Sequence, residues 1–161
     1  FRDAVCLVQI MHHEHVEDGY EVLLHGICRA EIIQLHQPSD EHSWCEAIIR
    51  PLETLDEELP TMQGVRDELY DLLTGDHLQS LQRAQAIVQW FEREDVTTHA
   101  LLELIGFTFV QDEETRYRFL AEPSFDGRSH IIRSELGQLD RLIGQARRQV
   151  RDDLERGMNL N

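Results

Sequence analysis

The first third of the chain has the residue pattern of β-strands. Strand-forming residues are concentrated in residues 4–16 and again in residues 20–24, and the dipeptide Asp18-Gly19 separates the two runs. Asp-Gly is favoured where a tight hairpin needs positive φ at both central residues, so the pattern predicts a β-hairpin. The chain is therefore expected to begin with two antiparallel strands.

Two further strands are predicted after the hairpin. Gly26 interrupts the apolar run as a bulge or a bend does, and residues 27–35 are expected to continue as a third strand. Residues 43–52 form the fourth predicted strand, which Pro51 ends. Four short strands leave open sheet edges, so we expect a partner, either upstream residues or another chain, to complete the sheet.

After this region the apolar spacing changes to that of helices. Gly75 is expected to end the first helix, and Asp76 with Gln79 forms a capping box for the second. Asp95 is expected to cap the third helix. The three apolar stripes are Met62, Val65, Leu69, Leu72 and Leu73; Leu78, Leu81, Ala84, Val88 and Phe91; and Leu101, Leu102, Leu104 and Ile105.

The last predicted helix is the longest. It begins after Pro123-Ser124 and runs to near Arg156, with Gly157 as its stop. Because only about three heptads are present, we interpret its apolar seam as packing within a helical bundle rather than as a dedicated dimer zipper. The seam steps by four and three residues alternately through Ile132, Leu136, Leu139, Ile143, Ala146 and Val150.

These patterns predict an α+β protein with three parts. A β subdomain is expected at residues 1–53, an acidic linker at residues 54–60 and a helical bundle at residues 61–161. No apolar run approaches the roughly 20 residues of a membrane helix, and the N-terminus lacks a secretion signal, so a cytoplasmic protein with no membrane partner is expected. Phe1 in place of Met suggests a fragment or a processed product.

Charge excludes several classes of function. All fifteen basic residues are Arg, so a usual P-loop, a Ser-Lys dyad and a Schiff-base mechanism are absent from this sequence. The net charge of −16 repels phosphate backbones and anionic lipid, which makes nucleic acid an unexpected partner. A patch of arginines is mixed with acidic residues, so we interpret it as a solvated helix face with intrahelical ion pairs. Its members are Arg141, Arg147, Arg148 and Arg151.

Cysteine and histidine give the candidates for metal chemistry. Cys6, Cys28 and Cys45 fall one per predicted strand without CxxC spacing, which favours reduced, buried thiols. His13 and His15 are two apart and could converge on one ion from the same face of a strand, but no HExxH motif supports a metal centre. We therefore expect exposed histidines, no metal and no cofactor. A small His-rich metal-binding protein stays as an alternative, as does a carboxylate hydrolase, although no carboxylate pair stands out for acid catalysis.

The order of several motifs resembles the LON substrate-binding domain, the N-terminal domain of Lon proteases. An apolar strand precedes Asp18-Gly19, and the next strand reads apolar-apolar-x-Gly-x-x-Arg with Gly26 and Arg29. Trp44 and Ala47 match an aromatic-x-x-Ala strand. The opening of the long last helix matches at Leu120, Glu122, Ser124 and Arg128. The resemblance covers nearly the whole chain, but the apolar F-P-L segment with which the family opens does not precede Phe1.

The resemblance implies a fold and a role. The β half would be an incomplete PUA-like pseudo-barrel of antiparallel strands, holding only the later strands, followed by the α-helical bundle with its long C-terminal helix. Neither the ATPase nor the Ser-Lys protease domain of Lon is in the sequence, so the resemblance implies a non-enzymatic module. Such a module would engage unfolded or degradation-tagged polypeptides.

Four aromatic side chains are the candidates for holding an extended polypeptide, and open strand edges could add a strand from it. The candidates are Trp44, Phe107, Phe109 and Tyr117. The alternative is that these aromatics only pack the junction between the two halves. Purely structural self-association is a further possibility, as a homodimer formed through the open sheet edge or the C-terminal helix.

Overall fold

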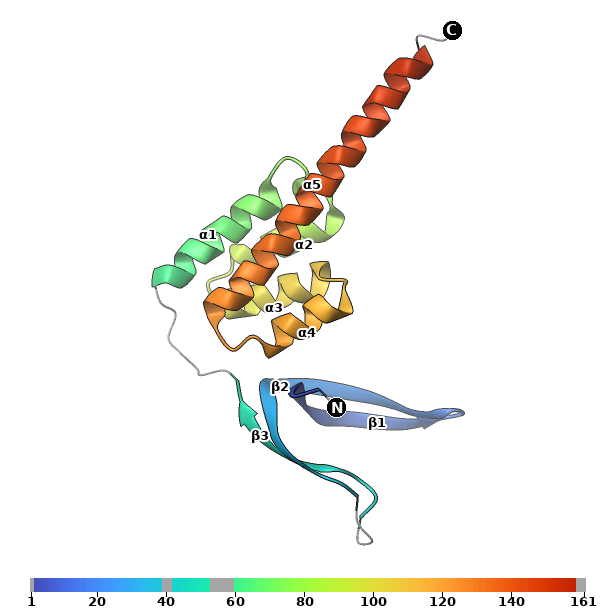
Figure 1. Ribbon diagram of the computed structural model, residues 1–161, viewed down its shortest axis with the longest axis vertical. Coiled ribbons are helices and arrows are strands. Elements are labelled where there is room, and N and C mark those ends of the chain that lie inside the picture. Colours follow the sequence, from blue (N-terminus) through green and yellow to red (C-terminus); the bar gives the residue numbers. More distant parts are fainter. Residues whose placement is uncertain (1, 39–41, 53–59, 159–161) are drawn as a thin grey trace. The chain divides into compact units, whose positions relative to one another are not determined.

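The first part of the chain forms one antiparallel sheet of three strands. In the computed structural model, which describes residues 2–38, 42–52 and 60–158, the strands are β1 (Ala4–Val16), β2 (Gly19–His36) and β3 (Glu46–Pro51), in the order β1-β2-β3 (Figure 1). Helices follow, and α5 (Phe125–Met158) is the longest. The predicted α+β class, with antiparallel strands before helices and a long C-terminal helix, is confirmed.

The hairpin between β1 and β2 lies where the sequence predicts it, but its turn is displaced by one residue. Val16 pairs with Gly19, so Glu17 and Asp18 are the central residues of the turn. Neither has positive φ, whereas Gly19 has φ +148°. A turn with positive φ at both central residues therefore does not form, and Gly19 supplies its left-handed backbone after the turn.

The second and third predicted strands are one strand. The β1/β2 register shifts between Leu7 and Val8, which pair with Cys28 and Gly26, so Ile27 is the extra residue of a bulge. The bulge predicted at Gly26 is thus confirmed, but the ladder continues through it, because a bulge adds one residue without ending the pairing. The prediction of four strands is wrong for the described part of the chain, where three form.

The chain divides into two compact units that are not contiguous in sequence. The first contains residues 1–55 together with residues 113–124, and the second contains residues 56–112 and 125–161. Helix α4 (Glu113–Ala121), which lies inside the range predicted for the helical bundle, thus belongs with the sheet. The predicted acidic linker, apart from Pro60, lies outside the described residues.

The second unit has a continuous apolar core. Its helices are α1 (Pro60–Thr74), α2 (Gln82–Phe91), α3 (Thr98–Phe109) and α5, with a short 3₁₀ helix, η1 (Leu78–Ser80), before α2. The fully buried side chains come from every one of these elements, including Leu69, Leu73, Leu78, Ala84, Leu101, Leu102, Ile105 and Leu136. Burial of this number of apolar side chains stabilises the unit by itself.

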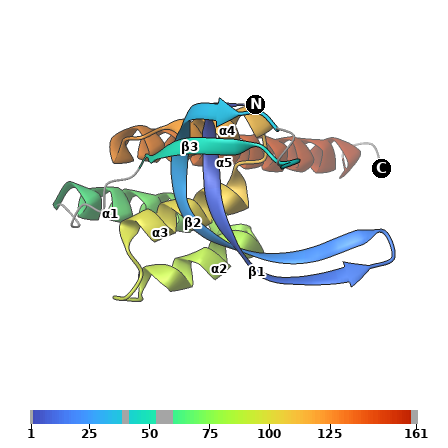
Figure 2. The same cartoon turned by 90° about the horizontal axis from the view of Figure 1, so that it is seen from below.

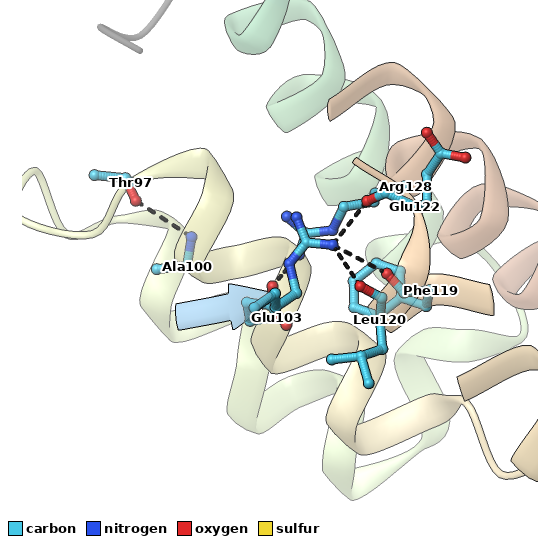
Figure 3. Close-up of polar contacts among 8 residues, drawn as sticks. Thr97, Ala100, Glu103, Phe119, Leu120, Glu122 and Arg128 are labelled. Atoms are coloured by element: carbon cyan, nitrogen blue, oxygen red, sulfur yellow. Dashed lines mark hydrogen bonds and ion pairs between the residues drawn. The ribbon is translucent and has the colours of Figure 1, made fainter. Parts of the chain in front are cut away.

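Two predicted helix caps are wrong. The capping box from Asp76 to Gln79 does not form, because the backbone there makes η1 and then restarts as α2, and neither helix has a side-chain cap. For α3 the cap is Thr97, whose Oγ1 accepts a hydrogen bond from the Ala100 N–H at 3.2 Å (Figure 3). Asp95 is engaged elsewhere: hydrogen bonds from Arg93 lower the pKa of its carboxyl below the usual value.

Helix α5 extends beyond its predicted end and includes Gly157. Its seam is buried at Ile132 and Leu136, becomes half-buried at Leu139 and is exposed at Val150. The seam therefore packs within the unit over its first half, as predicted, and the second half contributes little to the core. No helix in the described parts of the chain is long and apolar enough to cross a membrane.

Candidate functional site

Beyond β3, the strands β1 and β2 continue as a two-stranded ribbon (Figure 2). Pairing of β2 with β3 begins at Ala30, so residues 19–29 of β2 pair with β1 alone. The outer edge of β1 also has no strand beside it among the described residues. Unpaired edges expose backbone N–H and C=O groups that can accept an added strand.

The ribbon exposes apolar side chains along most of its length. Ile10 is 61% exposed and Leu23 is 63% exposed, although both types of side chain are usually buried. The other exposed large apolar residues of the ribbon are Leu7, Val8, Met11, Tyr20, Val22, Leu24 and Ile27. An apolar surface of this extent is typical of a site that contacts another molecule.

The core of the first unit is small by comparison. Its buried apolar side chains among the described residues are Ala4, Ala30 and Phe119. An isolated small sheet of this kind buries too little apolar surface to be stable alone, so the packing of α4 on β1 and β2 matters for the unit. Most of the apolar surface of the sheet is exposed to solvent.

The tip of the ribbon is acidic. Glu14 and Glu21 lie directly opposite each other across β1 and β2, and Glu17 and Asp18 form the turn beside them. Like charges opposite each other in a sheet are destabilising. The charge at the tip is therefore an unfavourable local feature of the ribbon, next to its exposed apolar surface.

Two of the four predicted binding aromatics belong to the first unit. Trp44, just before β3, is 61% exposed and stacks on His42 with the ring centroids 5.0 Å apart. Tyr117 on α4 is half-buried, and its hydroxyl accepts a hydrogen bond from the Ala4 N–H at 3.2 Å. The Arg2 guanidinium lies 4.3 Å from the centre of the Tyr117 ring. Tyr117 thus holds the start of β1 against α4, whereas the Trp44 ring stays exposed.

Tyr117 also lines a cavity of about 470 Å³ in the first unit, together with Leu52 and Pro123. Charged residues border the same cavity, among them Glu31 and Arg50, which form an ion pair across β2 and β3. The other two predicted aromatics lie on α3 in the second unit, where Phe107 is 82% exposed and Phe109 is half-buried. The aromatic set is therefore divided between the two units.

Arg29 is the central polar residue of the first unit. It is only 6% exposed, and its Nη1 donates to the carbonyl oxygens of Leu120 at 2.9 Å and Glu122 at 2.7 Å, with a longer contact to Phe119 at 3.4 Å. Figure 3 shows these three carbonyl groups converging at the end of α4. A cation is favoured there because the last carbonyls of a helix have no partner within it.

The other motif residues have structural contacts as well. Glu122 accepts hydrogen bonds from the backbone N–H and the Oγ of Ser124, just before α5 begins. Arg128 is buried in the second unit and pairs with Glu103 of α3 (Figure 3). Ala47 lies in β3 and pairs with Leu35. These residues hold elements together, and none of them contributes to the exposed apolar surface.

The histidines of the alternative metal site do share a face of β1. His13 and His15 both lie beside Tyr20, with ring centroids 6.2 Å and 5.2 Å from the tyrosine ring. Across the part of the chain that the structure describes, no three His, Cys, Asp or Glu side chains are close enough together to hold a metal ion. The contact that the structure shows for both imidazole rings is with the Tyr20 ring.

The thiols differ from their prediction. Cys6 and Cys45 are exposed and Cys28 is half-buried. Cys45 lies immediately before β3 rather than within a strand. The expectation of buried thiols is wrong because the sheet has little core in which to bury them.

Sequence reasoning missed one element of this unit, helix α4. The helix carries charged residues on most of its surface and buries Phe119, so it has no apolar stripe that could reveal it. The sequence also could not predict that Arg29 donates hydrogen bonds to the carbonyl oxygens at the end of α4, because every residue has a main-chain carbonyl.

An open antiparallel sheet followed by helices, with a long C-terminal helix, defines a LON-like fold. Among solved structures, the chain is similar to the N-terminal domain of Lon protease from the Mycobacterium avium complex, with a TM-score of 0.64. The similarity covers 85% of this chain and 71% of that chain at 17% sequence identity, and it shows the fold alone. No family model and no curated protein matches the sequence.

Proposed function

We propose that this chain is a non-catalytic module that binds extended polypeptides on the β1/β2 ribbon. The observation that carries the proposal is the row of exposed apolar side chains next to unpaired strand edges. An extended polypeptide can add its backbone to such an edge and place alternate side chains on the apolar surface. The LON-like fold supports the same role, because the sequence resembles a domain that engages polypeptides.

The ribbon also favours a particular kind of polypeptide. The carboxylates at its tip, led by the opposed pair Glu14 and Glu21, favour a segment with arginine or lysine beside apolar residues. An unfavourable charge pair that is retained in a small unit is expected where a ligand uses it. The preferred ligand is therefore an unfolded segment that is both apolar and basic.

Trp44 is the aromatic candidate best placed to take part. Its ring is exposed and its stacking on His42 limits its motion, which reduces the entropy lost when a ligand is bound. Phe107, Phe109 and Tyr117 remain candidates from the sequence, with Tyr117 already committed to the start of β1. For the metal-binding alternative, the described chain contains no group of three side chains that could hold an ion.

Fluorescence anisotropy with two labelled, unstructured peptides tests the proposal. The peptides share their apolar residues, and one carries Arg where the other carries Glu. We expect the wild type to bind the Arg peptide more tightly. The variant Ile10→Asn/Leu23→Asn should weaken binding about tenfold or more, because burying one such side chain is worth roughly 1.5–3 kcal/mol.

The matched control is Leu142→Asn on α5, since Leu142 is 62% exposed and lies outside the ribbon. This control should bind as the wild type does, and Glu14→Gln/Glu21→Gln should remove the preference for the Arg peptide. Trp44→Ala measures the contribution of that ring. Wild-type protein that binds neither peptide, or a Leu142→Asn variant as weak as the ribbon variant, contradicts the proposal.

Light scattering separates the proposed role from self-association. The monomer mass is 18.8 kDa. A wild-type dimer that Ile10→Asn/Leu23→Asn converts to a monomer would show that a second copy, rather than an unfolded segment, covers the ribbon.

A further inference from the structure

The second unit contains a cavity whose charged lining residues, among the side chains that the structure describes, are all arginines. It has a volume of about 310 Å³ and is lined by His77, Gly144, Arg147, Arg148 and Arg151. The four α5 residues are spaced by three, one and three positions, so they lie along one side of the helix. His77 comes from the segment between α1 and η1. Among the residues whose side chains the structure describes, no carboxylate lines this cavity, although the whole chain has a net charge of −16.

Gly144 is what lets His77 approach α5. A Cβ at this position would lie 2.6 Å from the His77 Nε2, so the imidazole would have to shift. Glycine weakens a helix interior by roughly 1 kcal/mol relative to alanine. Helix α5 therefore has a destabilising glycine at the point where the His77 imidazole packs. This point is one turn before Arg147, the first arginine of the cavity.

The arginines of the cavity have few partners within the protein. Arg147 donates one long hydrogen bond, at 3.3 Å, to the Asp76 carbonyl, and Arg148 and Arg151 have no carboxylate partner in the described chain. All four arginines of the patch are exposed, as expected for a solvated helix face, but the expected intrahelical ion pairs are not found for them in the described chain. Asp152 follows Arg148 by four residues, and the order of cation before anion is the less favourable one for such a pair.

Five arginines outside the cavity are paired with carboxylates. Ion pairs with a carboxylate are formed by Arg2, Arg50, Arg93, Arg128 and Arg133. In a chain with 31 acidic residues, a cavity lined by three arginines and by no carboxylate among the described side chains is a local reversal of the overall charge. Such a cavity concentrates the positive potential toward its interior.

We propose that this cavity binds a phosphate-type oxyanion. Guanidinium groups are permanently charged and planar, and they bind phosphate through paired, charge-assisted hydrogen bonds. The volume is at the lower end of the range for small-molecule sites, roughly 300–1,000 Å³, which suits inorganic phosphate or the phosphate group of a phosphomonoester. The site is separate from the ribbon and does not depend on polypeptide binding there.

Two-dimensional NMR of the full chain, titrated with inorganic phosphate at low salt, tests the proposal. We expect saturable shifts in the amides of His77 and of α5 around Arg148. Arg148→Gln/Arg151→Gln should weaken the binding at least about tenfold, because each guanidinium supplies charge-assisted hydrogen bonds. Gly144→Ala should also weaken it, since the new methyl group displaces His77, while the helix content does not fall.

The matched control is Arg83→Gln/Arg118→Gln, which removes the same charge from exposed positions on α2 and α4 outside the cavity. It should bind phosphate as the wild type does. A second titration compares a short phosphoserine peptide with its unphosphorylated form. Tighter binding of the phosphopeptide than of phosphate identifies a phosphomonoester as the ligand, and equal binding identifies the free ion.

Either result supports the site. The proposal is overturned if phosphate and the phosphopeptide give no saturable shifts at the cavity, or if the control variant loses as much binding as Arg148→Gln/Arg151→Gln. Binding of the unphosphorylated peptide at the same amides would also overturn it.

Discussion

Arg29 shows how a single residue can organise a small unit. Its guanidinium is buried at the carbonyl end of α4, where it donates to oxygens of Leu120 and Glu122. These oxygens are more than 90 positions away in sequence, and the bonds join β2 to α4 within the first unit. With so few apolar side chains buried there, a polar residue supplies a large part of the contact between sheet and helix.

Replacing Arg29 should therefore be severe. Arg29→Met keeps the length of the side chain but leaves the carbonyls at the end of α4 without their donor. We expect the free energy of unfolding, measured by urea denaturation, to fall by about 3 kcal/mol. Arg29→Lys should lose less, since an ammonium keeps the charge but has no planar fork. A loss below about 0.5 kcal/mol for Arg29→Met would show that water replaces the guanidinium without penalty.

The sequence could predict which of these residues matter but not what they contact. Arg29, Glu122, Ser124 and Arg128 were identified through the resemblance to the LON substrate-binding domain. Their partners include main-chain carbonyls and a backbone N–H, which every residue carries and no pattern reveals. The structure adds that Arg29 and Glu122 meet directly, and that Arg128 instead pairs with Glu103.

At the scale of elements, the start of α3 provides a test of capping. Thr97 occupies the cap position, and Asp95, two residues earlier, is exposed and paired with Arg93. We expect Thr97→Ala to lower the free energy of unfolding by about 1 kcal/mol in thermal or urea denaturation, because an N-terminal N–H of the helix loses its acceptor.

Asp95→Ala is the matched control for this prediction. It should change stability much less than Thr97→Ala does, because exposed ion pairs contribute little. If Asp95→Ala were the more damaging of the two, the capping assigned to Thr97 would be incorrect. Both variants remove one oxygen-bearing side chain at the same helix end, so the comparison isolates the cap itself.

Elements with a clear apolar pattern or turn signal were predicted from the sequence, and elements without one were not. The hairpin, the bulge at Gly26 and the helix ended by Gly75 all have local signals, and each forms near its predicted position. The turn shifted by one residue because φ at Glu17 and Asp18 is set by the pairing of the whole strands. Helix α4 was missed because its stability comes from β1, β2 and Arg29 rather than from a stripe of its own.

At the scale of the whole molecule, the order of the sequence does not follow the order of the units. The chain makes the sheet, enters the helical unit, returns to the sheet with residues 113–124 and then forms α5. A linear division into β and helical halves cannot represent this return. The candidate ribbon was likewise beyond sequence reasoning, since exposure is a property of what the fold leaves uncovered.

The division into units makes a prediction about local stability. Arg29 acts within the first unit, so Arg29→Met should increase amide hydrogen exchange in α4, β1 and β2 more than in α1 and α3. Leu69→Ala, which opens a cavity in the core of the second unit, should do the reverse. Mass spectrometry of exchanging peptides measures both patterns on the full chain.

The two variants together distinguish separate units from a single cooperative structure. Suppose that the amides of residues 113–124 exchange as fast as those of the sheet in Arg29→Met but stay protected in Leu69→Ala. Helix α4 then unfolds together with the sheet, in agreement with its contacts. Equal loss of protection in all elements with either variant would contradict this, because it requires the two units to open in one transition. A ribbon whose unit can open by itself would expose still more strand edge, which is the property that the proposed binding of extended polypeptides uses.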